Sequence, residues 1–191
     1  MADFRKLFLA LIAGALLLTT VASAQVTPPY SCQATAVPPL VRSEGIAEMM
    51  GDILLVCSGT PAAPITANVR LKLSTNITSN PLGSVSEATL VLDEGDGGFK
   101  GSGAAGQNVY QAIYISNDEI EWEGVVLYPG PPTNPASTIR LTNVRGNVQS
   151  RGDFATIWAY INIVSPTSVP VTNNQLVVAD TRPGLEFSTS Q

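Results

Sequence analysis

Histidine is absent from all 191 residues of this chain. Its imidazole is the commonest general base, a member of Ser-His and Cys-His catalytic pairs, and a frequent metal ligand. The acid–base chemistry that remains is that of two carboxylates, the pair that hydrolyses glycosides. The acidic residues are spread over many segments, and no two are singled out by position. We therefore expect a protein without enzymatic activity, with a two-acid glycoside-acting enzyme as the weaker alternative.

Three carboxylates, Asp93, Glu94 and Asp96, stand among three glycines in residues 93–98. Carboxylate oxygens on a flexible backbone can surround a hard cation such as calcium. The spacing does not fit the twelve-residue helix-loop-helix site, and no distal glutamate follows in the required place. We favour a solvated acidic turn, keep calcium binding as the alternative, and expect no cofactor.

Glu119, Glu121 and Glu123 alternate with Ile120 and Trp122. In a strand, this alternation directs the three carboxylates to one face and the apolar pair to the core. Like charges in a row need opposite cations, and Arg70, Lys72 and Arg140 lie at polar positions of other expected strands. We favour cross-strand ion pairs. An acidic strip that docks a basic partner is the alternative.

A second alternating segment begins at Phe154 and places Trp158 and Tyr160 opposite a row of aliphatic residues. If only the aliphatic side faces the core, the aromatic side is a platform for a sugar or a protein. If both sides are covered, the segment is a central strand, which is the interpretation that we favour. Tyr110 and Tyr114 supply further aromatic rings for a glycan-binding hypothesis.

The only two cysteines are Cys32 and Cys57. In an exported chain such a pair is oxidised, and closing a loop of this length stabilises the fold by about 3.5 kcal/mol. A catalytic thiol or a metal site would need a neighbouring histidine or a second cysteine pair. We therefore predict a structural disulfide.

The export itself is predicted by the first 24 residues. Arg5 and Lys6 precede an apolar run over residues 7–18, and small residues at 22–24 precede Gln25. A short positive segment, an apolar core too short to span a bilayer and small residues at the cleavage positions make a secretory signal peptide. The protein is expected to be secreted and extracellular, at the cell surface or periplasmic.

Without this leader the chain keeps 8 basic and 14 acidic residues, a formal net charge of −6. A nucleic acid would be repelled by that surface, so we exclude it as a partner. No later apolar run reaches 18 residues, so no membrane span is expected after leader removal. The predicted organisation is a signal peptide (1–24), an extended N-terminal segment (25–39) and one domain (40–191).

The rest of the chain consists of short segments with a period of two, separated by stretches rich in Gly, Pro, Asn and Ser. Residues 43–50 could form a helical turn, but we favour a strand. Valine, isoleucine and threonine are frequent, and long helical periodicity is absent. The pattern predicts an all-β fold, an immunoglobulin-like two-sheet antiparallel sandwich of about nine strands. These strands are expected at residues 53–57, 65–74, 87–92, 108–115, 119–127, 138–148, 154–164, 175–179 and 185–188.

Three blocks of sequence carry a resemblance: VPPLVRSEG at 37–45, GDILLVCSG at 51–59 and IRLTNVRGN at 139–147. With them, most of residues 30–187 resembles uncharacterised exported β-rich proteins of environmental bacteria. In those proteins such a domain stands at the N-terminus, sometimes ahead of immunoglobulin-like modules. The resemblance implies an extracellular or surface β-domain and transfers no catalytic residue.

Two functional hypotheses follow. The first is a secreted, non-enzymatic structural, adhesion or surface-assembly protein that associates with itself or with surface proteins through strand edges or the face of Trp158 and Tyr160. The second is a carbohydrate-binding module that uses exposed aromatic residues.

Overall fold

The computed structural model describes residues 30–59, 63–93, 108–127 and 136–184. Strands dominate this part of the chain, which also contains one short 3₁₀ helix, η1 (Gln149–Arg151). The alternation in the sequence becomes alternating burial, most clearly in β5 (Ile65–Leu73), where every second side chain is buried. The predicted all-β fold is confirmed.

One large sheet, sheet A, has the strand order β15-β1-β4-β12-β8-β9. Its three central strands, each seven residues long, are β1, β4 and β12. The bounds along the sheet are β15 (Val171–Thr172), β1 (Tyr30–Ala36), β4 (Ile53–Gly59), β12 (Ala136–Thr142), β8 (Thr89–Leu92) and β9 (Val109–Gln111).

The other large sheet, sheet B, has the order β10-β11-β5-β14-β16-β2. Beside β5, its strands are β10 (Ile113–Tyr114), β11 (Glu119–Leu127), β14 (Thr156–Val164), β16 (Gln175–Arg182) and β2 (Leu40–Arg42). Two small pairs complete the described strands: β3 (Glu48–Met49) with β13 (Arg145–Gly146), and β6 (Pro81–Leu82) with β7 (Val85–Ser86).

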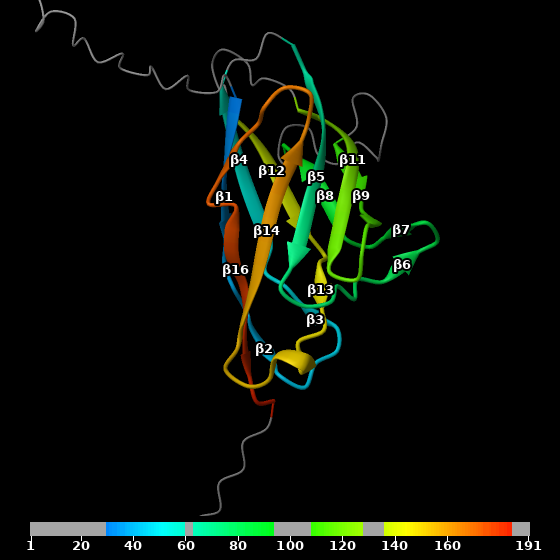
Figure 1. Ribbon diagram of the computed structural model, residues 1–191, viewed down its shortest axis with the longest axis vertical. Helices are drawn as coiled ribbons and strands as arrows, with labels where there is room; N and C mark the ends of the chain where they lie inside the picture. Colours follow the sequence, from blue (N-terminus) through cyan, green and yellow to red (C-terminus); the bar gives the residue numbers. More distant parts are fainter. Residues whose placement is uncertain (1–29, 60–62, 94–107, 128–135, 185–191) are drawn as a thin grey trace, which may run out of the picture.

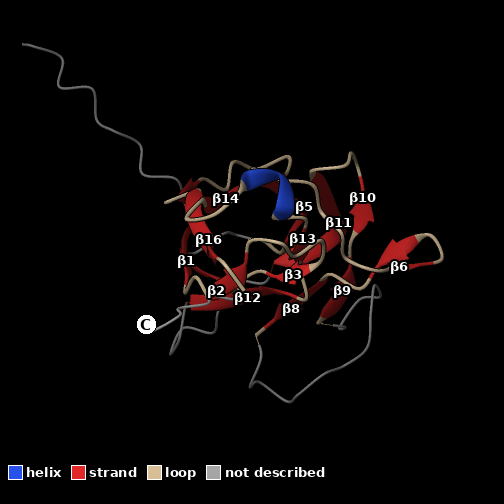
Figure 2. Ribbon diagram, turned by 90° about the horizontal axis from the view of Figure 1, so that it is seen from below, coloured by secondary structure: helices blue, strands red, loops and turns tan. Residues whose placement is uncertain are grey.

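The two sheets lie face to face as two layers, which are separate when the molecule is seen along its long axis (Figures 1 and 2). Between them, Trp122 of β11 is fully buried, and its Nε1 donates a hydrogen bond to the Ala88 carbonyl at 3.2 Å. A buried indole thus keeps its one polar atom satisfied. The predicted two-sheet sandwich is confirmed.

Most strand pairs are antiparallel, but β1 pairs with β15 and β16 pairs with β2 in parallel. The reason is that the chain changes sheet twice along the same edge: once from β1 to β2, and again from β15 to β16. The segment β1–β2 and the segment β15–β16 run in the same direction. β1 is therefore parallel to β15, and β2 is parallel to β16. The predicted antiparallel sandwich did not include these two parallel pairs.

Residues 30–36, which precede the predicted domain boundary at position 40, belong to the sandwich. The sequence suggested an extended N-terminal segment over residues 25–39, but Tyr30–Ala36 forms β1 inside sheet A. Where the chain then crosses from sheet A to sheet B, Gly51 lies beneath it: a Cβ on Gly51 would be 2.4 Å from the Val37 carbonyl oxygen. Only glycine fits that crossing without a shift of the backbone.

Residues 43–50 are not a continuous strand. The Gly45 amide donates to the Arg42 carbonyl at 3.0 Å, which closes a turn, and the chain re-enters a strand only at Glu48. Among the described residues, no helix is long and apolar enough to cross a membrane. The predicted leader (1–24) and the predicted strand at 185–188 lie outside the described residues.

Candidate functional site

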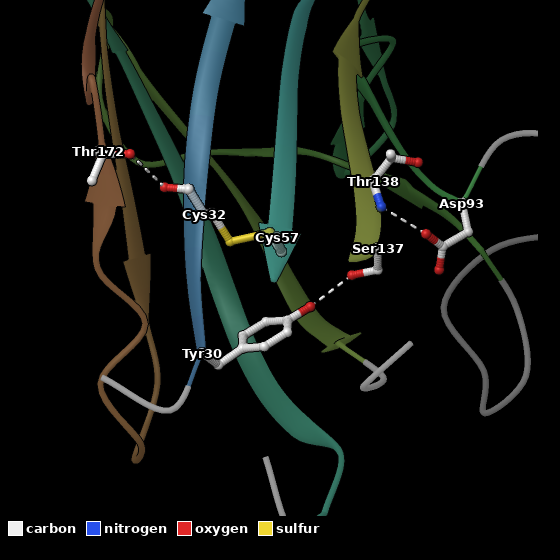
Figure 3. The surroundings of a disulfide bond; sticks show 7 residues. All are labelled: Tyr30, Cys32, Cys57, Asp93, Ser137, Thr138 and Thr172. Atoms are coloured by element: carbon white, nitrogen blue, oxygen red, sulfur yellow. Dashed lines mark hydrogen bonds between the residues drawn. A yellow bond between two sulfur atoms is a disulfide. The ribbon is translucent and has the colours of Figure 1, made fainter. Parts of the chain in front are cut away.

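The predicted disulfide is present and joins Cys32 of β1 to Cys57 of β4, which are directly opposite each other in sheet A (Figure 3). The Cys32 amide donates to the Pro170 carbonyl at 3.0 Å, and its carbonyl accepts from Thr172 Oγ1 at 3.3 Å. Because these backbone groups are directed to β15, the cysteine pair occupies a non-hydrogen-bonded position, where opposite Cα atoms approach most closely. Their Cα atoms are 3.9 Å apart.

Beside the disulfide, the Tyr30 hydroxyl and Ser137 Oγ lie 2.6 Å apart in the interior (Figure 3). Burial raises the pKa of Tyr30, the hydrogen bond with Ser137 opposes the shift, and the negative charge of Asp93 adds to it. Asp93 itself accepts a hydrogen bond from the Thr138 amide at 2.7 Å. This carboxylate is therefore engaged with the start of β12.

Of the proposed calcium ligands, only Asp93 is among the described residues; Glu94 and Asp96 lie outside them. Within the described part of the chain, no group of three or more His, Cys, Asp or Glu side chains could hold a metal ion. The calcium hypothesis thus stays a prediction about residues 93–98.

The three glutamates of β11 do not form an open acidic strip. Glu121 is only 3% exposed, and its carboxylate accepts hydrogen bonds from Arg70 Nε and from Asn68 Nδ2, the latter at 3.2 Å. Glu119 is half-buried, and Glu123 is exposed. The ion pair between Glu121 and Arg70 supports the cross-strand interpretation, because the basic side chain of β5 covers the acid.

A second ion pair of sheet B joins Lys72 Nζ to Asp118 Oδ2 at 3.1 Å. Asp118 lies just before β11, and hydrogen bonds from Ser116 and from Lys72 lower the pKa of its carboxyl. Lys72 is opposite Glu119 in the ladder. The outer face of this half of sheet B is therefore rich in charge, and its charges are largely paired.

The aromatic side of β14 lies on the outer face of sheet B. We expected both sides of this strand to be covered, but Tyr160 is 41% exposed, Trp158 is half-buried, and the aliphatic side alone packs in the core. Phe154, 66% exposed, precedes the strand with φ of 57°. Its ring lies 4.8 Å from the guanidinium carbon of Arg182, a cation–π contact.

Within the ladder, Tyr160 lies between Lys72 of β5 and Gln175 of β16. We name Trp158, Tyr160 and these two flanking residues the aromatic face. It combines ring surface with hydrogen-bonding groups on a regular sheet, so its residues keep a fixed spacing.

The two other tyrosines considered for glycan binding differ from each other in burial. Tyr110 is 4% exposed, and its hydroxyl accepts from the Val126 amide at 3.4 Å, so it is a core residue. Tyr114 is 39% exposed and donates its hydroxyl to the Ser79 carbonyl. Partial burial raises the pKa of Tyr114.

One further surface was not found from the sequence. On the outer side of sheet A, Leu54 and Val56 of β4 are 36% and 40% exposed. The apolar run at 53–57 indicates a wholly buried strand, yet the structure alternates it in and out. A shallow, open hollow of about 280 Å³ lies beside Leu54. Its lining is Thr35, Ala36, Val37, Asp52, Leu54 and Arg140.

No family model matches this chain, and no curated protein matches it. Among solved structures, it is similar to a DUF4466 family protein from Parabacteroides merdae, with a TM-score of 0.41, 6% identity and 73% of this chain covered. It is also similar to the pilus backbone protein RrgB from Streptococcus pneumoniae, with a TM-score of 0.40, 12% identity and 72% covered. The chain spans 40% of the first structure and 32% of the second.

A third similar structure is AvmM, which catalyses macrocyclization in alchivemycin A biosynthesis. Its TM-score is 0.28 at 10% identity, with 85% of this chain and 93% of that chain covered. These similarities support no inference about function, which has to come from the surfaces of the chain itself.

Proposed function

We propose that this chain is an extracellular, non-enzymatic structural or adhesion domain that presents the aromatic face of sheet B to a partner. The observation that carries the proposal is the outward position of Tyr160 and Trp158 on a strand whose other side is fully packed. Aromatic rings left partly exposed on a rigid sheet are typical of binding surfaces, where they contribute large contact areas at a small entropic cost.

The chemistry of the acids supports a role without catalysis. Glu121, Asp118 and Asp93 each accept hydrogen bonds that fix a strand or a turn. A carboxylate with such structural partners is held in place by them, whereas a two-acid hydrolase needs two carboxylates facing a common cleft. The buried disulfide supports an oxidising, extracytoplasmic location.

A carbohydrate is the second candidate partner, favoured by the groups that flank the rings. Gln175 is opposite Tyr160 in the ladder. The exposed Asn162 follows Tyr160 on the same side of β14. Sugars combine apolar ring faces with hydroxyl groups, which fit an aromatic surface bordered by amides. The partner would then be a glycan that binds to the same aromatic face.

The test is to measure binding of the exported chain to cells, to extracellular matrix proteins and to a glycan array, together with Trp158→Ala and Tyr160→Ala. We expect both variants to lose at least about tenfold in affinity, in line with exposed aromatic anchors. Val164→Ala is the matched control, because Val164 lies on the same outer side of β14 at 44% exposure. Binding that survives both aromatic substitutions would overturn the assignment of the face.

A further inference from the structure

Residues 76–78, Asn-Ile-Thr, match the acceptor pattern for N-linked glycosylation, an asparagine followed two residues later by serine or threonine. Asn76 is the only asparagine of the chain that stands in this pattern. The leader predicts export, and exported chains are the ones that receive this modification. The surroundings of Asn76 and Thr78 show what each side chain contributes to the fold.

The Asn76 side chain has room for a large substituent. It is exposed, just after β5, where the chain passes beside β13 (Figure 1). The backbone carbonyl of Asn76 accepts a hydrogen bond from the Asn147 amide at 2.8 Å. Its side-chain amide makes no hydrogen bond with any described residue. A glycan on Nδ2 therefore projects into solvent and displaces no contact of the described fold.

The Thr78 hydroxyl has the opposite surroundings. Its Oγ1 is buried and makes no hydrogen bond within the described part of the chain. A buried hydroxyl without a partner lowers the stability of a fold, and valine would fill nearly the same space without that cost. The fold therefore does not account for a hydroxyl at position 78, whereas the acceptor pattern requires one there.

The segment gains its backbone partners late during synthesis. The Ile77 amide donates to the Asn117 carbonyl at 2.7 Å. The Thr78 amide donates to the Arg145 carbonyl at 2.9 Å, and Ile77 forms an isolated bridge with Gly146. At about 5–20 residues per second, partners about 70 residues further along the chain are made several seconds after Thr78. During that interval the pattern is unpaired, and the Thr78 hydroxyl is not yet buried.

We propose that Asn76 is an N-glycosylation site, modified during export before residues 76–78 pair with residues 145–147. The donor is an oligosaccharide carried on a lipid pyrophosphate. A bond forms between Asn76 Nδ2 and the anomeric carbon of the first sugar, while the bond from that carbon to the phosphate oxygen breaks. The lipid pyrophosphate leaves, the amide nitrogen loses one proton, and nothing is oxidised or reduced. This goes beyond the proposed function, which concerns the aromatic face of sheet B.

The test is to produce the full chain in eukaryotic secretory cells, which carry out this transfer, and to weigh the secreted chain by mass spectrometry before and after peptide N-glycosidase. We expect the parent chain to lose mass on treatment, with Asn76 converted to aspartate. Asn76→Gln and Thr78→Val should be secreted without a glycan. Asn80→Gln is the matched control, because Asn80 is exposed in the same segment but is followed by Pro81 and Leu82. It should carry as much glycan as the parent.

Further variants separate the modification from a structural role of Thr78. Thr78→Ser keeps a hydroxyl and should keep the glycan. Thr78→Val should melt at or above the temperature of Asn76→Gln, which also lacks the glycan. A Thr78→Val variant that melts well below Asn76→Gln would assign the hydroxyl to the fold and overturn its assignment to the modification.

A parent chain secreted without a glycan would overturn the proposal, and so would a glycan that persists in Asn76→Gln. A version in which a leader of the host replaces residues 1–24 reads a failure of export separately from a failure of modification. Partner binding through Trp158 and Tyr160, measured on Asn76→Gln, tests the proposed function independently of the glycan.

Discussion

The two sheets share one core but are stabilised by different chemistry. Sheet A has a covalent bond between its neighbouring strands β1 and β4, and on its outer side Arg140 forms an ion pair with Asp52. Sheet B has no cysteine, and its strands β5 and β11 are joined on the outside by the buried Glu121 with Arg70 and by Lys72 with Asp118.

This difference gives the sandwich two unlike surfaces. A face held by a buried disulfide does not depend on outer charges for its strand pairing, so its centre can be aliphatic, as Leu54 and Val56 are. A face held by ion pairs stays hydrated, and its aromatic residues are surrounded by hydrogen-bonding groups.

Removing the disulfide is the largest test of this difference. We expect Cys32→Ala with Cys57→Ala to lower the free energy of unfolding by about 2–5 kcal/mol, because the unfolded chain loses its cross-link. Urea denaturation with and without reductant measures the loss, and reductant should leave the double variant unchanged. A double variant as stable as the parent would show that sheet A does not depend on its covalent bond.

The equivalent test in sheet B is Glu121→Ala. We expect a loss of about 1.5–3 kcal/mol, because the hydrogen bonds from Arg70 and Asn68 to a charged acceptor disappear. Glu123→Ala is the matched control on the same strand; Glu123 is exposed, so the change should stay within about 0.5 kcal/mol. Equal losses in the two variants would argue against a special role for the buried ion pair.

The smallest expected effect concerns pH and belongs to sheet A. The folded-state pKa of Tyr30 is raised, so its contribution to stability is complete below the ordinary tyrosine pKa of about 10 and is lost as pH rises towards the folded-state value. Tyr30→Phe should cost about 1 kcal/mol at neutral pH by removing the bond with Ser137. It should also reduce the alkaline loss of stability, as followed by thermal melting from pH 8 to 11.

Sequence patterns predicted the features that depend on local alternation or on residue identity. The strand at 65–73, the buried Trp122 and the cysteine pair all follow from them. They did not predict the outward direction of Leu54 and Val56, since a continuous apolar run has no visible period. They indicated cross-strand pairs between the glutamates of 119–123 and bases such as Arg70, but not which acid each base would cover, because this depends on the pairing of two strands about 50 residues apart.

The aromatic side of β14 shows the same limit. The alternation of Trp158 and Tyr160 with aliphatic residues was clear from the sequence, but not which layer would cover them. That depends on the number of layers in the fold, and the sandwich has only two (Figure 2). Their outward position follows once β14 is placed in the middle of sheet B.

The position of the disulfide along β1 has a mechanical consequence. β1 begins at one end of the long axis and β16 ends at the other (Figure 1), so tension applied through these two strands loads their ladders in shear. Cys32 is the third residue of β1 and is bonded to β4, in the interior of sheet A. Tension entering at Tyr30 therefore passes to β4 through sulfur after two residues, and the rest of β1 carries almost none of it.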